Sequence, residues 1–285
     1  MNLILEFLKF IIFSLGIVIT SKYLLVPILQ KISIHLELSA KASGNIAGIA
    51  TSVPELLTVI FSVASGFLDT SIYNIISSNI INLLQYTFSI YINKNQKYLR
   101  NKGIIINLIL CSITILIPIV IVMFKIELNL GMCAIFVILL ILFYYIDHNV
   151  HKLYLEKEDA EIVAKNNIKD NSKNRLGKLI ILLIELFFIS IILYFFGELL
   201  GKALTNLADK FNLPQTLLGI LLGFITSLPE LITFTESQRK EKIKSDDETN
   251  KLGVVEATNN LLTSNIMNLF VIQTIGILIF EIIRR

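Results

Sequence analysis

Cysteine and charge are both scarce in this sequence. Two cysteines, Cys111 and Cys133, occur among 285 residues, and both lie inside apolar runs, where we expect them to act as small packing residues. Charged residues make up 16% of the chain and gather in a few short stretches, which excludes a soluble protein of this length. The sequence also lacks a phosphate-binding loop, a nucleophile triad and a basic nucleic-acid footprint. We therefore expect neither an enzyme nor a nucleic-acid-binding protein, and no cofactor.

Long apolar runs occupy most of the chain. The mean hydropathy is +0.74, and 54% of the residues are hydrophobic. Each run is near the ~20 residues that a helix needs to cross a bilayer, so the sequence predicts an all-α polytopic membrane protein. The first run lacks a small-residue cleavage site and is too long for a signal peptide, so we expect it to span the membrane. The eight expected spans are 3–29, 43–66, 71–92, 103–124, 129–147, 177–200, 213–236 and 253–282.

Basic residues predict the topology and the division into halves. If the N-terminus lies outside, the loops after the first, third, fifth and seventh spans face the cytoplasm, and most Lys and Arg residues fall on that side. We therefore expect an integral protein of the cell (inner) membrane with both termini outside. The polar stretch 148–176 is the expected cytoplasmic linker between an N-terminal half, 1–147, and a C-terminal half, 177–285. The first repeat falls within 43–92 and the second within 213–282.

Two short segments of the sequence occur twice. Residues 48–58 read GIATSVPELLT and residues 223–233 read GFITSLPELIT, with seven of the eleven positions identical. A second segment, SSNIINL at 77–83, is matched by TSNIMNL at 263–269. The copies of the first segment fall in the second and seventh spans, an odd number of spans apart, so they cross the membrane in opposite directions. Such an inverted repeat is typical of transporters, in which the site lies at the midplane between the halves.

The first segment predicts a helix break beside an acidic residue at membrane depth. Its proline lacks an N–H and clashes with the carbonyl four residues earlier, so we expect a local break that frees carbonyl oxygens. Unwound backbone is tolerated at this depth only inside protein or beside water. The break places Ser52, Glu55 and these carbonyls close together, and hard cations such as Ca²⁺ and Na⁺ prefer oxygen ligands of this kind. Two carboxylates, Glu55 and Glu230, would neutralise one Ca²⁺, and the same pair could instead take sodium ions or protons.

The alternative to an ion site is a proline kink used for packing, with each glutamate near an interface. An ionised side chain at the bilayer centre costs roughly 2.5–3.5 kcal/mol by insertion scales, so two such residues in matching positions favour a cation site. In the second segment Ser78 and Asn82 lie one helical turn apart and share a face, as do Ser264 and Asn268. Their neutral oxygens would complete a cation shell, although small polar residues also hold membrane helices together.

These motifs resemble those of the cation/calcium antiporter superfamily, of which the sodium/calcium exchangers are the best-known branch. The family pattern is a G-T-S-x-P-E block followed by a G-N-x-x-G-S-N-x-x-N block, occurring twice in inverted orientation. Here the first blocks read GIATSVPE and GFITSLPE, and the second blocks cover 73–82 and 259–268. The motifs cover four short segments, and the expected topology extends the resemblance over most of the chain.

The resemblance implies a function and assigns roles to ten residues. The family carries out alternating access, in which Ca²⁺ and Na⁺, or H⁺ in some branches, compete for one site that opens to each side in turn. Glu55 and Glu230 would be the central carboxylates, and Thr51 and Thr226 would supply carbonyl oxygens. The residues implied to line flanking sodium sites are Ser52, Ser227, Ser78 and Ser264, and those implied to line the centre are Asn82 and Asn268.

The sequence departs from the family pattern in several places. Both glycines of the second block are replaced, by Tyr73 and Ser77 in one copy and by Asn259 and Thr263 in the other, which leaves close helix approach there in question. Asn268 stands where relatives often carry aspartate. Family members usually have ten spans, so a homodimer or a partner protein could cover the face left by the absent last pair.

We therefore expect a protein of the lipid bilayer that exchanges Ca²⁺ for Na⁺ by secondary antiport. The first alternative keeps antiport but uses H⁺ as the counter-ion or carries another divalent cation. The second alternative belongs to a different class, a cation-binding membrane protein that does not transport or that forms one subunit of a larger assembly.

Overall fold

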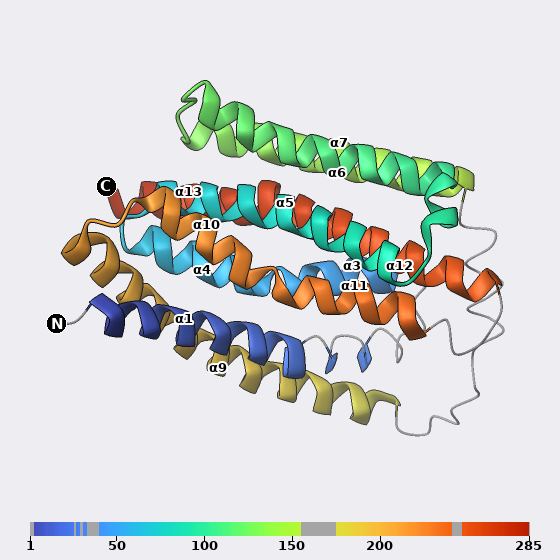
Figure 1. Ribbon diagram of the computed structural model, residues 1–285, viewed down its shortest axis with the longest axis horizontal. Coiled ribbons are helices and arrows are strands. Elements are labelled where there is room, and N and C mark those ends of the chain that lie inside the picture. Colours follow the sequence, from blue (N-terminus) through green and yellow to red (C-terminus); the bar gives the residue numbers. More distant parts are fainter. Residues whose placement is uncertain are drawn as a thin grey trace.

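The computed structural model describes residues 3–25, 27–28, 31–32, 40–154, 175–240 and 247–284. Over these residues the chain is helical, as expected, and contains no strand (Figure 1). The helices are α1 (Leu3–Thr20), η1 (Ser21–Leu25), α3 (Ala40–Thr51), α4 (Val53–Ala64), α5 (Leu68–Ile92), η2 (Gln96–Arg100), α6 (Lys102–Met123), α7 (Leu130–Tyr154), α9 (Arg175–Phe211), α10 (Gln215–Thr226), α11 (Leu228–Lys240), α12 (Asp247–Ile266), η4 (Met267–Ile272) and α13 (Gln273–Arg284).

Seven of the eight expected spans are long and apolar enough to cross a membrane. The remaining span, the third along the chain, is α5, whose 25 residues include buried Asn74, Ser78, Asn79 and Asn82. A helix of this length measures about 37 Å and exceeds the ~30 Å hydrocarbon core. The polar side chains of α5 face protein rather than lipid because α5 lies among the central helices of the bundle (Figure 1).

The helices form a bundle with the repeats at its centre (Figure 1). Helices α1 and α9 pack together on one side, and α6 and α7 lie on the opposite side. One apolar cluster joins α5, α6 and α7 to α12 and α13, with Phe136 edge-on to Phe270 at 6.0 Å between ring centroids. A second apolar cluster joins α1, α9 and α10 and includes Phe10, Leu207 and Leu218. The bent helices α3–α4 and α10–α11 lie between these two outer pairs.

The two copies of the repeat run in opposite directions through the bundle. The pair α3–α4 runs toward the end where both chain termini lie, whereas α10–α11 runs toward the other end (Figure 1). We call these the terminal end and the basic end, because the second carries the connection after α5 with Lys94, Lys97 and Arg100. The predicted inversion is therefore present in the fold.

Some helix bounds differ from the expected spans. Helix α9 continues to Phe211 rather than ending near residue 200, because Leu204 and Leu207 still pack in the apolar cluster with α1. Helix α12 begins at Asp247, before the expected span. Most of the expected linker, residues 155–174, lies outside the described residues.

Candidate ion site

Four glycines bring the two halves into close contact at the centre of the bundle. On α10, a Cβ at Gly219 would stand 2.5 Å from the Thr70 carbonyl oxygen and 2.7 Å from the Tyr73 Cβ of α5. On α3, a Cβ at Gly48 would stand 2.7 Å from the Asn260 carbonyl oxygen of α12. Each of these glycines has a partner four residues earlier or later, the spacing that lets membrane helices cross closely. The pairs are Gly44 with Gly48 and Gly219 with Gly223.

These crossings answer the question left by the replaced glycines of the second block. The glycines missing from α5 and α12 are present on the helices packed against them. In each pair the first glycine precedes the eleven-residue repeat and the second is its first residue. The G-x₃-G spacing in the sequence could therefore have predicted the close approach. The facing residues are Gly219 and Tyr73, Gly223 and Ser77, Gly44 and Asn259, and Gly48 and Thr263.

Each bent helix is interrupted at a single residue. Ser52 separates α3 from α4 with φ −81° and ψ −1°, and Ser227 separates α10 from α11 with φ −80° and ψ 0°. The N–H of Ser52 still donates to the Gly48 carbonyl oxygen at 3.2 Å, so the break is a kink and smaller than an unwound segment. Because Pro54 has no N–H, the Ala50 carbonyl oxygen lacks its usual partner four residues later.

The two glutamates lie directly after the kinks and inside the protein. Glu55 and Glu230 occupy the first turns of α4 and α11, and both are fully buried. Their carboxyl groups come from opposite halves and lie close enough to repel each other. Thr226, Ser227 and Ser78 lie around the Glu55 carboxyl, so residues of both halves surround it.

Ser264 joins the two halves beside Glu230. Its hydroxyl donates to Glu230 Oε1 at 3.2 Å and accepts a hydrogen bond from Asn82 Nδ2 at 3.2 Å. The same oxygen lies 3.0 Å from the Ser52 Oγ. Thr51 also lies beside the Glu230 carboxyl. Ser52 and Asn82 belong to the first half, so the structure assembles this cluster from both repeats.

Asparagines connect α5 to α12 next to this cluster. Asn268 Nδ2 donates to Asn79 Oδ1 at 3.1 Å. Asn79 and Asn265 each donate to the other's carbonyl oxygen at 3.4 Å, which is the helix-joining role considered for small polar residues. The structure buries all ten predicted site residues, namely Thr51, Ser52, Glu55, Ser78, Asn82, Thr226, Ser227, Glu230, Ser264 and Asn268.

Six oxygen atoms of these ten residues accept no hydrogen bond from the part of the chain that the structure describes. Buried polar groups nearly always have a partner, and an unpaired charged group is costly. All six can donate an electron pair to a cation, and both halves contribute, which fits a hard cation with oxygen ligands. The atoms are Oε1 and Oε2 of Glu55, Oε2 of Glu230, Oδ1 of Asn82 and of Asn268, and Oγ of Ser227.

A comparison with protein families identifies the chain. The sequence model of the family described as "Sodium/calcium exchanger protein" matches residues 6–147 and 181–285, which include both copies of the repeat and all ten residues of the cluster. The chain belongs to the sodium/calcium exchanger family. Its members are cation transporters of the membrane rather than enzymes, which confirms the predicted family and transporter class. Comparisons with curated proteins and with solved structures found no match.

In this sodium/calcium exchanger family member, a threonine and an asparagine fix the backbone of each glutamate. Thr58 Oγ1 donates to the Glu55 carbonyl oxygen at 2.9 Å and accepts from Asn74 Nδ2 at 2.8 Å. The threonine is the last identical residue of the eleven-residue repeat, so the sequence carries a signal of its importance without showing its role. The second half repeats both bonds, each at 2.9 Å, through Thr233, Glu230 and Asn260.

The two halves of the cluster nevertheless differ. Ser264 lies 3.0 Å from Ser52, whereas the equivalent pair, Ser78 and Ser227, is not joined, and the Ser227 hydroxyl has no partner among the described residues. The helix geometry differs as well, because the π-helix η4 (Met267–Ile272) interrupts the second half where α5 stays regular. Such π-helical turns are frequent at functional sites. The hydroxyl contact that joins the halves beside Glu230 therefore has no equivalent between Ser78 and Ser227.

This asymmetry predicts unequal effects of removing the two equivalent serine hydroxyls. Ser264→Ala removes the hydroxyl bonded to Glu230, and a hydrogen bond to a charged group contributes about 1.5–3 kcal/mol. We expect calcium affinity to fall by at least about 10-fold, since each 1.4 kcal/mol is a factor of ten. Ser78→Ala should lower it by less than about 3-fold, because the Ser78 hydroxyl donates to neutral oxygens at 3.4 and 3.5 Å, and neither Glu55 carboxylate oxygen has a hydrogen-bond partner among the described residues. Titration calorimetry measures the calcium affinity of both purified variants, and an equal loss of affinity in the two would contradict the asymmetry.

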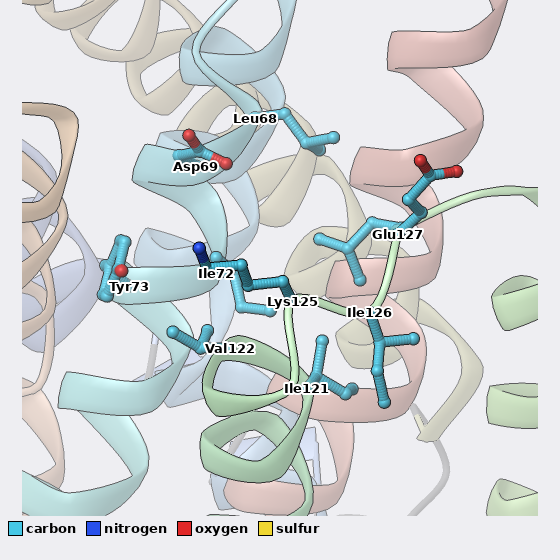
Figure 2. A pocket seen from close by; sticks show the side chains of 10 residues that line it. Leu68, Asp69, Ile72, Tyr73, Ile121, Val122, Lys125, Ile126 and Glu127 are labelled. Carbon is cyan, nitrogen blue, oxygen red and sulfur yellow. The ribbon is translucent and has the colours of Figure 1, made fainter.

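Two of the cavities formed by the described residues lie outside the cluster. The larger, of about 300 Å³, is at the terminal end between α5 and the turn after α6, where Figure 2 shows Asp69, Lys125 and Glu127 among apolar side chains. The smaller, of about 130 Å³, lies at the basic end between η1 and α11 and includes Thr233. Over the described residues, no three His, Cys, Asp or Glu side chains are grouped to hold a metal ion. The charge available to a cation in the cluster is therefore that of its two carboxylates.

Proposed function

We propose that the chain is a secondary antiporter that exchanges Ca²⁺ for Na⁺ by alternating access, with Glu55 and Glu230 as ligands shared by both ions. The observation that supports this is the set of buried acceptor oxygens without partners, contributed by both halves. Two carboxylates neutralise one Ca²⁺ or two Na⁺. Amide and hydroxyl oxygens complete the coordination shell without adding charge.

The helix ends around the cluster favour the same ions. Thr51 and Thr226 are the last residues of α3 and α10, and the C-terminal end of a helix carries a partial negative charge that attracts cations. Glu55 and Glu230 lie in the first turns of α4 and α11, where the partial positive charge stabilises an ionised carboxylate. We therefore assign the carbonyl oxygens of Thr51 and Thr226 to the ion, together with both carboxylates.

Alternating access and orientation follow from the inverted repeat and from the basic loops. Since the halves are inverted copies, the two access states arise when they exchange conformations around a fixed midplane site. We assign the basic end to the cytoplasm because Lys and Arg gather in cytoplasmic loops. The N-terminus then lies outside the cell membrane.

Calcium flux into proteoliposomes tests the proposal. Purified protein is reconstituted, and ⁴⁵Ca²⁺ uptake is measured with an outward sodium gradient, with a proton gradient, and with neither. We expect uptake with the sodium gradient alone, because Na⁺ released at the outer face of the vesicle vacates the carboxylates for Ca²⁺ from that same side, which the reorienting site then carries inward. Uptake with the proton gradient alone would replace Na⁺ by H⁺ as the counter-ion. Calcium binding without uptake under either gradient would contradict antiport and indicate a cation-binding protein.

A further inference from the structure

The cavity at the basic end adjoins the predicted ion site. It is lined by Lys22 and Tyr23 of η1, by Pro27 and by the side of α11 that carries Thr233 and Glu236. Pro229, the residue before Glu230, lines it as well. The cavity therefore reaches from the basic end of the bundle to the turn of α11 that holds a buried carboxylate.

Two oxygen-bearing side chains of α11 line this cavity, Glu236 and Thr233, and Glu230 lies one turn beyond Thr233. Glu236, Thr233 and Glu230 are spaced three residues apart, so each step is about 4.5 Å along the helix axis. Glu236 is exposed, Thr233 is buried and hydrogen-bonded to the Glu230 backbone, and Glu230 is fully buried. A cation entering the cavity would thus meet a carboxylate and then a hydroxyl, one helical turn before the buried Glu230 carboxylate.

The equivalent path in the first half is filled. Phe61 stands at the position of Glu236, six residues after the glutamate, and packs against α9. Its ring lies 5.7 Å from that of Tyr194, and a Cβ at Gly201 would stand 3.1 Å from the Phe61 Cβ. Gly197 also leaves space that the Phe61 ring occupies. The space beside α11 is therefore a cavity, whereas the equivalent space beside α4 is filled by the Phe61 ring.

We propose that the cavity between η1 and α11 is an access site for the transported cation, that Glu236 is its carboxylate ligand, and that Phe61 blocks the equivalent path from the terminal end. This inference rests on the proposed function of the central cluster. The ligand class is a hard cation, Ca²⁺ or Na⁺, because the lining oxygens are carboxylate and hydroxyl. A carboxylate at the mouth of a cavity raises the local concentration of cations and their association rate.

Lys22 lines the same cavity but forms no ion pair with Glu236. Its ammonium group lies 2.9 Å from the Tyr23 hydroxyl and 4.3 Å from the centroid of the Tyr23 ring. Glu236 forms no ion pair with any residue that the structure describes. The carboxylate is therefore available to a cation, and Lys22 marks the opposite wall of the same cavity.

Cysteine labelling tests the difference between the two paths without requiring transport. Ile232 lines the cavity, and Leu57 is its equivalent in the first half, packed in the apolar cluster with α1 and α9. We expect the Ile232→Cys variant to react with a small cationic methanethiosulfonate at least about 10-fold faster than Leu57→Cys, since only an accessible thiol reacts. Unsubstituted protein gives the background of the buried Cys111 and Cys133. Equal rates would overturn the sided access.

A second labelling experiment removes the Phe61 ring and uses the same methanethiosulfonate reagent. Phe61→Ala combined with Leu57→Cys should raise the labelling rate of that cysteine by at least about 10-fold, because the path beside α4 is then open to the reagent. Phe61→Leu, which keeps an apolar side chain of similar reach, serves as the matched control and should leave the rate low. An unchanged rate in the alanine variant would overturn the role of Phe61.

Calcium uptake tests Glu236 separately. Glu236→Gln should raise the KM for Ca²⁺ about 3- to 10-fold at low ionic strength and leave kcat within about 2-fold, since a lost steering charge slows association rather than the later steps. Glu236→Asp should restore the KM. The difference should shrink at 0.5 M choline chloride, because salt screens exposed charges. An unchanged KM at low ionic strength would overturn Glu236 as a ligand. If Glu55→Gln transports normally while the labelling pattern holds, Glu55 is not a ligand of the transported ion, and the access site stands.

Discussion

Replacing either buried glutamate by glutamine is expected to abolish calcium transport and to leave the folded protein intact. Glu55 and Glu230 supply the charge that neutralises the ion, and removing one member of a buried charge pair costs about 3–5 kcal/mol, a loss of at least ~100-fold in affinity. Glutamine keeps the size of the side chain, and neither Glu55 oxygen has a partner among the described residues that glutamine would lose. Proteoliposome flux of Glu55→Gln and Glu230→Gln measures the effect.

Thermal unfolding separates lost binding from lost folding in these variants. Calcium at ~100 times its Kd should stabilise the wild type by about 2.7 kcal/mol, because a ligand that binds only the folded state shifts the equilibrium. Both glutamine variants should lack this shift and should unfold without calcium at a temperature no lower than the wild type does. Glu198→Gln is the matched control, because Glu198 also lies in a membrane span but pairs with Lys202 at 2.6 Å on α9. Full activity in both site variants would contradict the site.

Enlarging a glycine at the central helix crossings is expected to remove most of the folded protein. At Gly48 even a Cβ would stand 2.7 Å from a carbonyl oxygen of α12, and at Gly219 it would stand 2.5 Å from one of α5. Overpacking a well-packed site costs about 1–3 kcal/mol and more where the backbone itself must move. Gly48→Leu and Gly219→Leu should therefore lower the yield of monodisperse protein on size exclusion and the unfolding temperature of what remains.

The chain offers a control for these glycine variants. Gly177 lies near the start of α9 with no atom within 4 Å of an added Cβ, so Gly177→Leu should match the wild type in yield and unfolding temperature. The glycine variants also contrast with the glutamate variants. The glycine variants should lose folded protein, whereas the glutamate variants should stay folded and lose only calcium affinity. Wild-type yield and stability in Gly48→Leu would show that α3 and α12 do not cross as closely as the structure places them.

Much of the fold follows from patterns that the sequence displays directly. Apolar runs near the length of a bilayer crossing mark the spans, and the odd separation of the two copies of the repeat predicts their opposite directions. The span that hydropathy marks most weakly is α5, because its buried Asn74, Asn79 and Asn82 face other helices instead of lipid. A segment surrounded by protein does not need the apolar side chains by which lipid-facing spans are recognised.

The sequence alone predicts the members of the candidate site, but it does not predict how they are connected. The repeat singles out Glu55 and Glu230, because an acidic residue beside a proline at membrane depth is costly unless it serves a function. It does not show that Ser264 joins Ser52 while Ser78 stays apart from Ser227, since equivalent residues in inverted copies look alike in sequence. The difference depends on how the halves sit against each other.

The sequence alone does not show the roles of Thr58 and of the paired glycines, for another reason. Each acts through a residue on a helix far away in the sequence, Thr58 through Asn74 of α5 and Gly48 through the backbone of α12. Phe61 and Glu236 are likewise unremarkable until the repeat is laid over the fold. Only then does one position hold an aromatic ring in one half and a carboxylate in the other.

The central claim is that one carboxylate from each half forms a single site for Ca²⁺, and equilibrium dialysis with ⁴⁵Ca²⁺ tests it most directly. Purified wild-type protein should bind one Ca²⁺ per chain, and Na⁺ should displace it with a dependence steeper than first order, because two Na⁺ replace one Ca²⁺ on two carboxylates. Binding should be lost in Glu55→Gln and in Glu230→Gln alike. Two independent calcium ions per chain, or binding that survives in both variants, would contradict the account.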